Sequence, residues 1–224
     1  MRFDLHIHSV YSRDSGSPID SILAHAVDIG LDGIAICDHD TVEGGIAGVR
    51  RARELGLSLI VIPGVEVTTT KGHVIALGVR EDIPSKETPQ ETIARIRKLG
   101  GVVVIPHPFK RLSHGIGDFS GLDVDAVEIF NSRFITGEAN RKAKRMAREM
   151  GIPEVAGSDA HSVPMIGYAV TEIDAKRDTT SVLEAICDGR TRVHGRRTPP
   201  GIFAAQMVRG FCRRVKEILG FRVK

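Results

Sequence analysis

The chain has 224 residues, of which 42% are hydrophobic and 26% are charged, and its formal net charge at pH 7 is +3. This composition suits one α/β domain with a substantial core. No apolar run reaches the roughly 18 residues of a membrane span, and the N-terminus lacks the pattern of a signal peptide. Three widely spaced cysteines indicate a reducing compartment rather than a disulfide framework, so we expect a cytoplasmic protein.

Positive charge is concentrated at the C-terminal end of the chain. Residues 190–224 contain ten lysine and arginine residues and one acidic residue, so their net charge is +9. The remaining residues carry a net charge of −6. An acidic body is expected of a protein whose carboxylates bind cations, whereas the basic end needs a separate explanation.

The first predicted strand contains the sequence Asp4-Leu5-His6-Ile7-His8. Because side chains alternate along a strand, Asp4, His6 and His8 are expected on one face. The odd-numbered residues are apolar and are expected on the opposite face, covered by helices. Two imidazoles on one face are suited to bind zinc or another transition metal.

Strands and helices then alternate along the chain. After the first strand, we expect helices at 18–29, 44–55, 88–100, 137–150 and 180–188, and strands at 33–37, 59–62, 73–77, 102–105, 126–130 and 153–156. Such alternation predicts βαβ units and a parallel sheet. Nearly every strand ends in a histidine, aspartate or glutamate. In a parallel α/β barrel these ends form one active site, whereas an open sheet would gather its ligands at one crevice. The distribution over six strand ends therefore favours the barrel.

Nine side chains are candidate metal ligands: His6, His8, Asp14, His39, Glu66, His73, His107, Asp159 and His161. Imidazoles and carboxylates without thiolates suit Zn, Mn or Fe. The set is too large for one tetrahedral ion, so we expect two or three divalent metal ions, with Glu66 able to bridge two. A set of structural core histidines is the alternative, and the repeated strand-end position argues against it.

Two observations refine this set of candidate ligands. His73 begins its predicted strand instead of ending it, which makes it a weaker candidate than the others. Asp38 and Asp40 flank His39 and are expected to orient its imidazole as hydrogen-bond acceptors in the second shell of ligands.

The order of these motifs resembles that of a known family, the PHP (polymerase and histidinol phosphatase) metal-dependent phosphoesterases. The motifs are Asp4-Leu5-His6-Ile7-His8-Ser9, Cys37-Asp38-His39-Asp40-Thr41, Gly64-Val65-Glu66, His107-Pro108 and Ser158-Asp159-Ala160-His161-Ser162. The resemblance implies a distorted, seven-stranded (β/α)7 TIM-like barrel over residues 1–197. It also implies three metal positions: one on His6, His8, Glu66 and Asp159, one on Glu66, His73 and His107, and one on His39, His161 and an acidic residue after the first motif.

Two departures from the family pattern matter. In the segment Ser12-Arg13-Asp14-Ser15-Gly16 the aspartate lies one residue further from the serine than in the usual Ser-Asp-Gly, at the offset that some members use for a ligand. Only residues 80–89 follow the strand bearing His73, where members that act on nucleotides and RNA ends commonly have a helical insertion. The chain therefore resembles a compact member.

The resemblance and the ligand set together predict hydrolysis of a phosphate ester by a metal-bound hydroxide. The expected enzyme is a phosphatase or nuclease, and its substrate is a phosphorylated metabolite, a nucleotide or an oligonucleotide. Lys110, Arg111 and Arg133 follow strand ends and could hold the phosphate. Two alternatives stay open: an amidohydrolase that cleaves C–N bonds, and a metal-stabilised subunit that binds RNA.

The basic C-terminal segment, residues 198–224, is predicted to form a unit of its own. Apolar residues recur at helical spacing over 201–219, with arginine and lysine on the other side. Such a helix can contact nucleic acid or a membrane surface, but its apolar stripe more often packs on its own domain or forms a homo-oligomer contact. Two tyrosines and no tryptophan leave little surface for stacking on bases, which weakens a sequence-reading nuclease.

Overall fold

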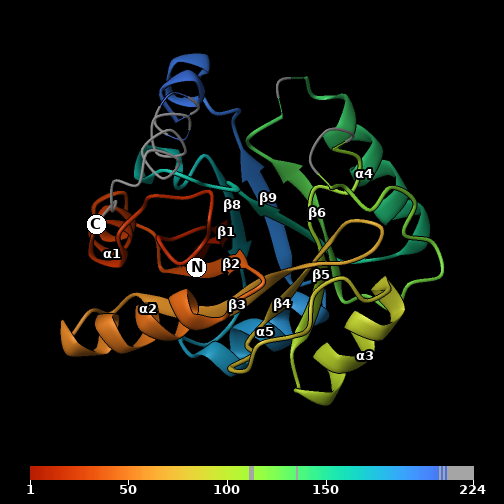
Figure 1. The fold of residues 1–224 in the computed structure, drawn as a ribbon, viewed down its shortest axis with the longest axis horizontal. Helices are drawn as coiled ribbons and strands as arrows, with labels where there is room; N and C mark the ends of the chain where they lie inside the picture. Colours follow the sequence, from red (N-terminus) through yellow and green to blue (C-terminus); the bar gives the residue numbers. More distant parts are fainter. Residues whose placement is uncertain (111–113, 135, 207, 209, 211–224) are drawn as a thin grey trace, which may run out of the picture.

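A computed structural model describes residues 1–110, 114–134, 136–206, 208 and 210 (Figure 1). These residues alternate strands and helices in nearly the order that the sequence predicts. The strands are β1 (Arg2–Ile7), β2 (Gly33–His39), β3 (Ile60–Thr68), β4 (His73–Leu77), β5 (Val102–Ile105), β6 (Ala126–Asn131), β7 (Glu154–Gly157), β8 (Ala169–Ile173) and β9 (Thr191–Gly195). The helices are α1 (Ile19–Asp28), α2 (Glu43–Glu54), α3 (Pro89–Lys98), α4 (Glu138–Met150) and α5 (Thr179–Cys187), with a 3-10 turn at Val163–Met165.

The strands β1 to β7 lie side by side in chain order and curve into a nearly closed barrel. The closure lies at the end of β1, where Ile7 bridges Ala160 just after β7, and the backbone N–H of His8 donates to the Ala160 carbonyl at 2.9 Å. The start of β1 pairs instead with β8, which continues to β9. The predicted TIM-like barrel of seven strands is thus confirmed, with the β8–β9 pair added to its edge.

The sequence predicts a parallel sheet, but the sheet contains both parallel and antiparallel pairs of strands. β4 runs antiparallel to both β3 and β5, and β8 is antiparallel to β1. Only about four residues separate β3 from β4, too few for the crossover helix that a parallel connection requires. The reversed direction has one consequence for function: the first residue of β4, His73, lies at the same end of the barrel as the last residues of its neighbours.

The barrel interior below the site is apolar. It contains alternate residues of successive strands, and three residues of α5 close its lower end: Val182, Ala185 and Ile186. Phe3 and Leu5 belong to this interior cluster, so the prediction that the odd-numbered side of the first strand faces the helices is wrong for them. An irregularity in pairing between Asp4 and Ile7 breaks the alternation, so Ile7 packs against α1 while His6 joins the interior.

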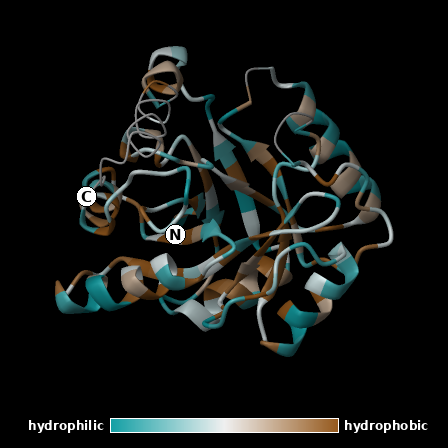
Figure 2. Cartoon of the chain, in the orientation of Figure 1, coloured by the Kyte–Doolittle hydropathy of each residue, from teal (hydrophilic) through white to brown (hydrophobic). Residues whose placement is uncertain are grey.

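The remaining helices cover the outside of the barrel. Two further apolar clusters lie between the sheet and these helices, one beneath α1 and α2 and one beneath α3 and α4. Figure 1 shows these two pairs on opposite sides of the strands, and Figure 2 shows hydrophobic residues gathered on the strands. A capping box begins α3, since Thr88 accepts a hydrogen bond from the backbone N–H of Glu91 and the Glu91 carboxylate accepts one from the backbone N–H of Thr88.

The C-terminal segment continues directly from the barrel. Residues 200–206 are helical, but most of the amphipathic helix predicted for 201–219 lies outside the described residues. Before this helix, Thr198 donates its backbone N–H to the Ser132 carbonyl at 2.9 Å, and the hydroxyls of these two residues lie 2.8 Å apart. Among the helices that the structure describes, none is long and apolar enough to cross a membrane.

Candidate metal centre

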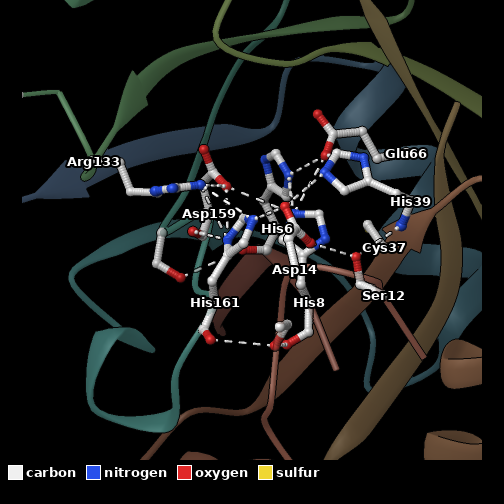
Figure 3. A network of polar contacts seen from close by, with 12 residues as sticks. His6, His8, Ser12, Asp14, Cys37, His39, Glu66, Arg133, Asp159 and His161 are labelled. Carbon is white, nitrogen blue, oxygen red and sulfur yellow. Dashed lines mark hydrogen bonds and ion pairs between the residues drawn. The ribbon is translucent and has the colours of Figure 1, made fainter. Parts of the chain in front are cut away.

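All nine predicted ligands meet at the end of the barrel where β1, β2, β3, β5 and β7 terminate. Figure 3 shows side chains from segments far apart in the sequence converging there, among them Glu66, Asp159 and His161. They form four overlapping groups in which the nitrogen and oxygen atoms lie within 4.8 Å of one another. The groups are His6, His8 and Asp159; His6, Glu66 and His107; His39, Glu66 and His73; and His8, Asp14, His39 and His161.

Glu66 is the centre of this arrangement. Its carboxylate is fully buried, and its two oxygens face different imidazoles. The Oε1 atom lies 2.8 Å from His73 Nδ1 and 2.9 Å from His107 Nε2. The Oε2 atom lies 3.2 Å from His6 Nε2 and 3.3 Å from His8 Nε2. A carboxylate with its oxygens divided in this way is placed to bridge two cations.

The first candidate cation position combines both imidazoles of the HxH motif with a carboxylate from the loop after β7, which closes the barrel against the end of β1. His6 Nε2 and His8 Nε2 are 3.1 Å apart, and His8 Nε2 is 3.6 Å from Asp159 Oδ1. Asp159 follows β7 with a φ of +54°, a left-handed conformation that is uncommon for a residue with a side chain. Such strain is concentrated at functional sites in proteins.

The third position uses the loop after β1. Asp14 Oδ2 lies 2.9 Å from His161 Nε2 and 3.4 Å from His39 Nε2, while Ser12 Oγ donates a hydrogen bond to Asp14 Oδ1 at 2.8 Å. The extra residue in this loop therefore does not remove its acidic side chain from the site. Asp14 is the most exposed of these groups, with 31% of its side chain accessible to solvent.

The nitrogen and oxygen atoms of this cluster are suitable ligands for divalent metal ions. The cluster consists of imidazole nitrogens and carboxylate oxygens, and the nearby Cys37 thiol donates to the Leu5 carbonyl at 3.7 Å instead of joining it. Within the described residues, the buried Nδ1 of His39 makes no hydrogen bond, although Glu66 Oε2 lies 3.4 Å away. Nitrogen and oxygen ligands without sulfur suit Zn, Mn or Fe.

The electrostatics of the cluster favour positive charge at its centre. Burial opposes protonation of His6, but the carboxylates of Glu66, Glu128 and Asp159 outweigh it and raise the pKa of His6 well above its usual value. Burial likewise opposes ionisation of Glu66, yet the surrounding histidines, His73 foremost, hold the pKa of Glu66 well below its usual range. Carboxylates that attract a proton to one imidazole also attract a metal ion.

The third group of ligands, which includes His161, differs from this centre in its electrostatics. Burial and the Arg133 guanidinium lower the pKa of His161 to about 3, so its imidazole is neutral at pH 7 and keeps the lone pair that a metal requires.

Glu128 is a site residue that the sequence analysis did not assign. It lies within β6, and its Oε1 accepts a hydrogen bond from His6 Nδ1 at 3.1 Å. Its Oε2 accepts from the His107 backbone N–H and from Asn131 Nδ2, both at 2.9 Å. Carboxylates in this position orient a metal-binding imidazole and raise its basicity. The only signal in the sequence was a glutamate near the end of an otherwise apolar strand.

Asp38 and Asp40 do not act in the way that was predicted. The Asp38 carboxylate accepts hydrogen bonds from the backbone N–H and hydroxyl of Ser9, both at 2.6 Å. The Asp40 carboxylate accepts from the backbone N–H and hydroxyl of Thr68 at 2.7 and 3.0 Å. Both carboxylates therefore hold the backbone of segments that carry ligands, and the His39 imidazole lies 3.4 Å from Asp14 Oδ2 and from Glu66 Oε2.

Two of the three predicted phosphate-binding cations lie at the site. Lys110 Nζ is 2.8 Å from Asp159 Oδ2, and Arg133 donates to Asp159 Oδ1 at 2.9 Å. Asn131 Nδ2 also donates to Asp159 Oδ2, at 3.2 Å. Complete burial opposes ionisation of Asp159, but the charges of Arg133 and Lys110 outweigh it and hold the pKa of Asp159 well below its usual range. The third predicted cation, Arg111, lies outside the described residues.

Comparison with known proteins agrees with this geometry. The family described as PHP domain matches residues 4–105, and the family described as PHP-associated matches residues 137–191. The chain belongs to the PHP family. This confirms the resemblance that the successive motifs indicated.

Individual relatives share different parts of this chain. An uncharacterized protein of Methanocaldococcus jannaschii is 36% identical over 154 residues, which are 64% of this chain and 89% of the relative. A phosphoribosyl 1,2-cyclic phosphate 1,2-diphosphodiesterase of Eggerthella lenta is 37% identical over 90 residues, covering 37% of this chain and 32% of the relative. A two-domain protein of Bacteroides vulgatus containing a predicted PHP-like metal-dependent phosphoesterase superposes with a TM-score of 0.73 at 18% identity, covering 88% of this chain and 65% of that one, and so shares its fold.

Proposed function

We propose that this PHP protein hydrolyses phosphate esters with two or three divalent ions, Mn, Zn or Fe, held by the nine ligands. The observation that carries the proposal is the division of the Glu66 carboxylate between two pairs of imidazoles, with a third ligand group beside them. Metal ions held close together can lower the pKa of water to about 7 and stabilise the charge that develops on phosphate oxygens.

The protein itself supplies position and charge for the phosphate. Lys110 and Arg133 both reach Asp159, at the inner edge of the first ligand group. The side chain of Lys110 is 14% exposed and that of Arg133 is 16% exposed, so solvent screens their charges only weakly. We assign these two side chains to the non-bridging oxygens of the bound phosphate, which an arginine can hold through two parallel hydrogen bonds.

A phosphate diester is the substrate type that we favour. The matched part of the Eggerthella lenta relative belongs to an enzyme named for a cyclic phosphodiester. A metal cluster that carries a third ligand group can also neutralise charge on both the attacking and the leaving side of phosphorus. An oligonucleotide satisfies this description, and so does a nucleotide or another metabolite whose phosphate is cyclic.

The direct test is hydrolysis by protein that has been stripped of metal and then refilled with Mn, Zn or Fe. An aryl phosphate monoester and the matching diester serve as substrates, and metal content is measured on the same samples. We expect turnover only in refilled protein, faster with the diester, and its loss in His8→Ala. His194→Ala is the matched control, because His194 is an exposed histidine paired with Glu172 on the β8–β9 pair.

Two results would overturn the proposal. One is metal binding without hydrolysis of either ester under any of the three ions. The other is hydrolysis of an amide bond by the refilled protein while both phosphate esters stay intact, which would point to amidohydrolase chemistry.

A further inference from the structure

A cavity of about 250 Å³ lies beside the third ligand group. Asp14 and His161 form its inner wall, and the turn from Ser162 to Pro164 forms one side. The C-terminal helical segment contributes Gln206 and Gly210. The cavity therefore runs from the metal ligands to a part of the chain that the PHP-associated match, which ends at residue 191, does not include.

Two polar atoms in this wall are buried and have no hydrogen-bond partner among the residues that the structure describes. Gln206 is 8% exposed and Ser162 is 9% exposed. In the described part of the chain, neither the Oε1 of Gln206 nor the Oγ of Ser162 has a hydrogen-bond partner. Leaving such atoms unpaired in a protein interior is costly, and most buried polar atoms are satisfied. Two of them on one small cavity point to a ligand with complementary hydrogen-bonding groups.

The segment that carries Gln206 is anchored to the site. Thr198 is hydrogen-bonded to Ser132 through both backbone and hydroxyl, and the Ser132 hydroxyl is also 2.8 Å from the Ser158 carbonyl, next to Asp159. One helical turn further along, the ring of Phe203 lies 5.9 Å from the guanidinium carbon of Arg133. The segment is therefore a wall of the active site, held against two of its loops.

We propose that this cavity binds the alcohol part of the phosphate ester, and that this part is a sugar carrying free hydroxyl groups. An amide oxygen can only accept a hydrogen bond, whereas a serine hydroxyl both donates and accepts. Neighbouring hydroxyls of a sugar satisfy both atoms at once. The volume is below the 300–1,000 Å³ or so of sites for drug-sized ligands and suits a single ring. The inference rests on the proposed phosphoesterase function, since it places the phosphate at the metal ligands.

Binding of inert analogues tests the cavity separately from catalysis. We would measure, by calorimetry on manganese-loaded protein, the affinities of the non-hydrolysable phosphonate isosteres of ribose 5-phosphate and of phenyl phosphate. The two carry the same anionic group, but only the first has hydroxyls. One buried hydrogen bond corresponds to roughly tenfold in affinity, so we expect wild-type protein to prefer the ribose analogue by about 10-fold or more.

Three variants make the result specific. Gln206→Leu keeps the bulk of the side chain and removes the acceptor, and it should reduce the preference to about 2-fold or less. Ser162→Ala should reduce it in the same direction and serves as a second probe. Val208→Ala is the matched control on the same segment, because Val208 is 62% exposed, and it should keep the full preference.

The outcomes separate this inference from the proposed function. Equal preference for the ribose analogue in wild-type, Gln206→Leu and Ser162→Ala proteins would overturn the sugar-binding cavity, even if aryl phosphates are hydrolysed. Preference that depends on Gln206, in a protein that hydrolyses no phosphate ester, would support the cavity and contradict the proposed function.

Discussion

At the scale of single residues, one buried carboxylate connects the cluster. Glu66 lies within 3.3 Å of four imidazoles that come from β1, β4 and the loop after β5. Its place in the cluster could be predicted because the glutamate follows a predicted buried strand, as several of the histidines do. Glu128 could not be predicted in the same way, because its partner His6 is 122 residues away and nothing in the local sequence of β6 indicates that pairing.

Replacing Glu128 tests the support of the first cation position. In Glu128→Gln the side chain keeps its size but loses the charge that faces His6 Nδ1, so we expect metal affinity to fall about 10- to 100-fold. Competition with a chromogenic chelator measures this change. Glu172→Gln, an exposed glutamate on β8, is the control. Unchanged metal affinity in Glu128→Gln would show that Glu128 does not orient a ligand.

Asp14 tests the third cation position alone. Because Asp14 contacts His39 and His161 and neither His73 nor His107 in this structure, Asp14→Asn should remove one bound ion and leave the positions around Glu66 filled. Elemental analysis of protein saturated with manganese measures the number of ions. Asp20→Asn, on the surface of α1, is the control. A loss of every ion, or of none, would contradict three separable positions.

At the scale of elements, the sequence predicts which segments are strands better than how they run. The alternation of predicted strands and helices placed most elements within a few residues of their bounds in the structure. The direction of β4 and the irregularity in β1 depend on pairing between strands, which local patterns do not report. That irregularity decides which face of β1 His6 occupies.

The capping box makes a prediction about α3. Thr88→Ala removes the hydroxyl that accepts from the Glu91 backbone N–H, and such a loss costs about 1 kcal/mol of unfolding free energy. Hydrogen bonds from the Thr88 hydroxyl and backbone lower the pKa of Glu91. A lowered pKa means that this stabilisation is present above the unfolded pKa and is lost as the pH falls through the folded one.

We therefore expect the difference between wild type and Thr88→Ala to be greatest near neutral pH and to shrink in acid below the usual glutamate range. Urea unfolding at several pH values, with metal saturation held constant, measures it. A difference that grows as the pH falls would show that the Glu91 carboxylate takes no part in the cap.

The end of β7 makes a prediction about how tightly the barrel holds its ligands. A Cβ atom at Gly157 would lie 2.4 Å from His6 Cβ and 2.5 Å from Glu128 Oε1. Gly157→Ala should therefore displace both side chains and cost about 1–3 kcal/mol of unfolding free energy, with weaker metal binding. Gly201→Ala is the control, because a Cβ there meets no atom within 4 Å. Equal melting temperatures and equal metal affinities in the two variants, measured by thermal unfolding and metal titration, would contradict this packing.

At the scale of the whole molecule, the barrel separates an apolar lower end from a charged upper end. Three apolar residues of α5 fill the bottom, and the ligands of strands β1, β2, β3 and β4 occupy the top. A barrel could be predicted because nearly every strand is followed by a chemically distinctive residue, and its seven strands were implied by the resemblance to the PHP family. The contact of Thr198 with Ser132 could not, because it joins a loop after β6 to a segment with no recognisable motif.

Several predictions about the whole molecule remain predictions. They are the cytoplasmic location, the metal identity, the division into residues 1–197 and 198–224, and a homo-oligomer or nucleic-acid contact through the basic C-terminal helix. The contacts of Thr198 and Phe203 with the barrel show that residues 198–206, at least, pack on the domain.

The measurement that tests the central claim most directly is turnover of an aryl phosphodiester by Glu66→Gln beside wild type, with metal content determined on both. Loss of the bridging charge should release at least one ion and reduce turnover by about 100-fold or more. Glu172→Gln should behave like wild type. Full turnover by Glu66→Gln, with the metal content unchanged, would contradict a phosphoesterase site organised around this carboxylate.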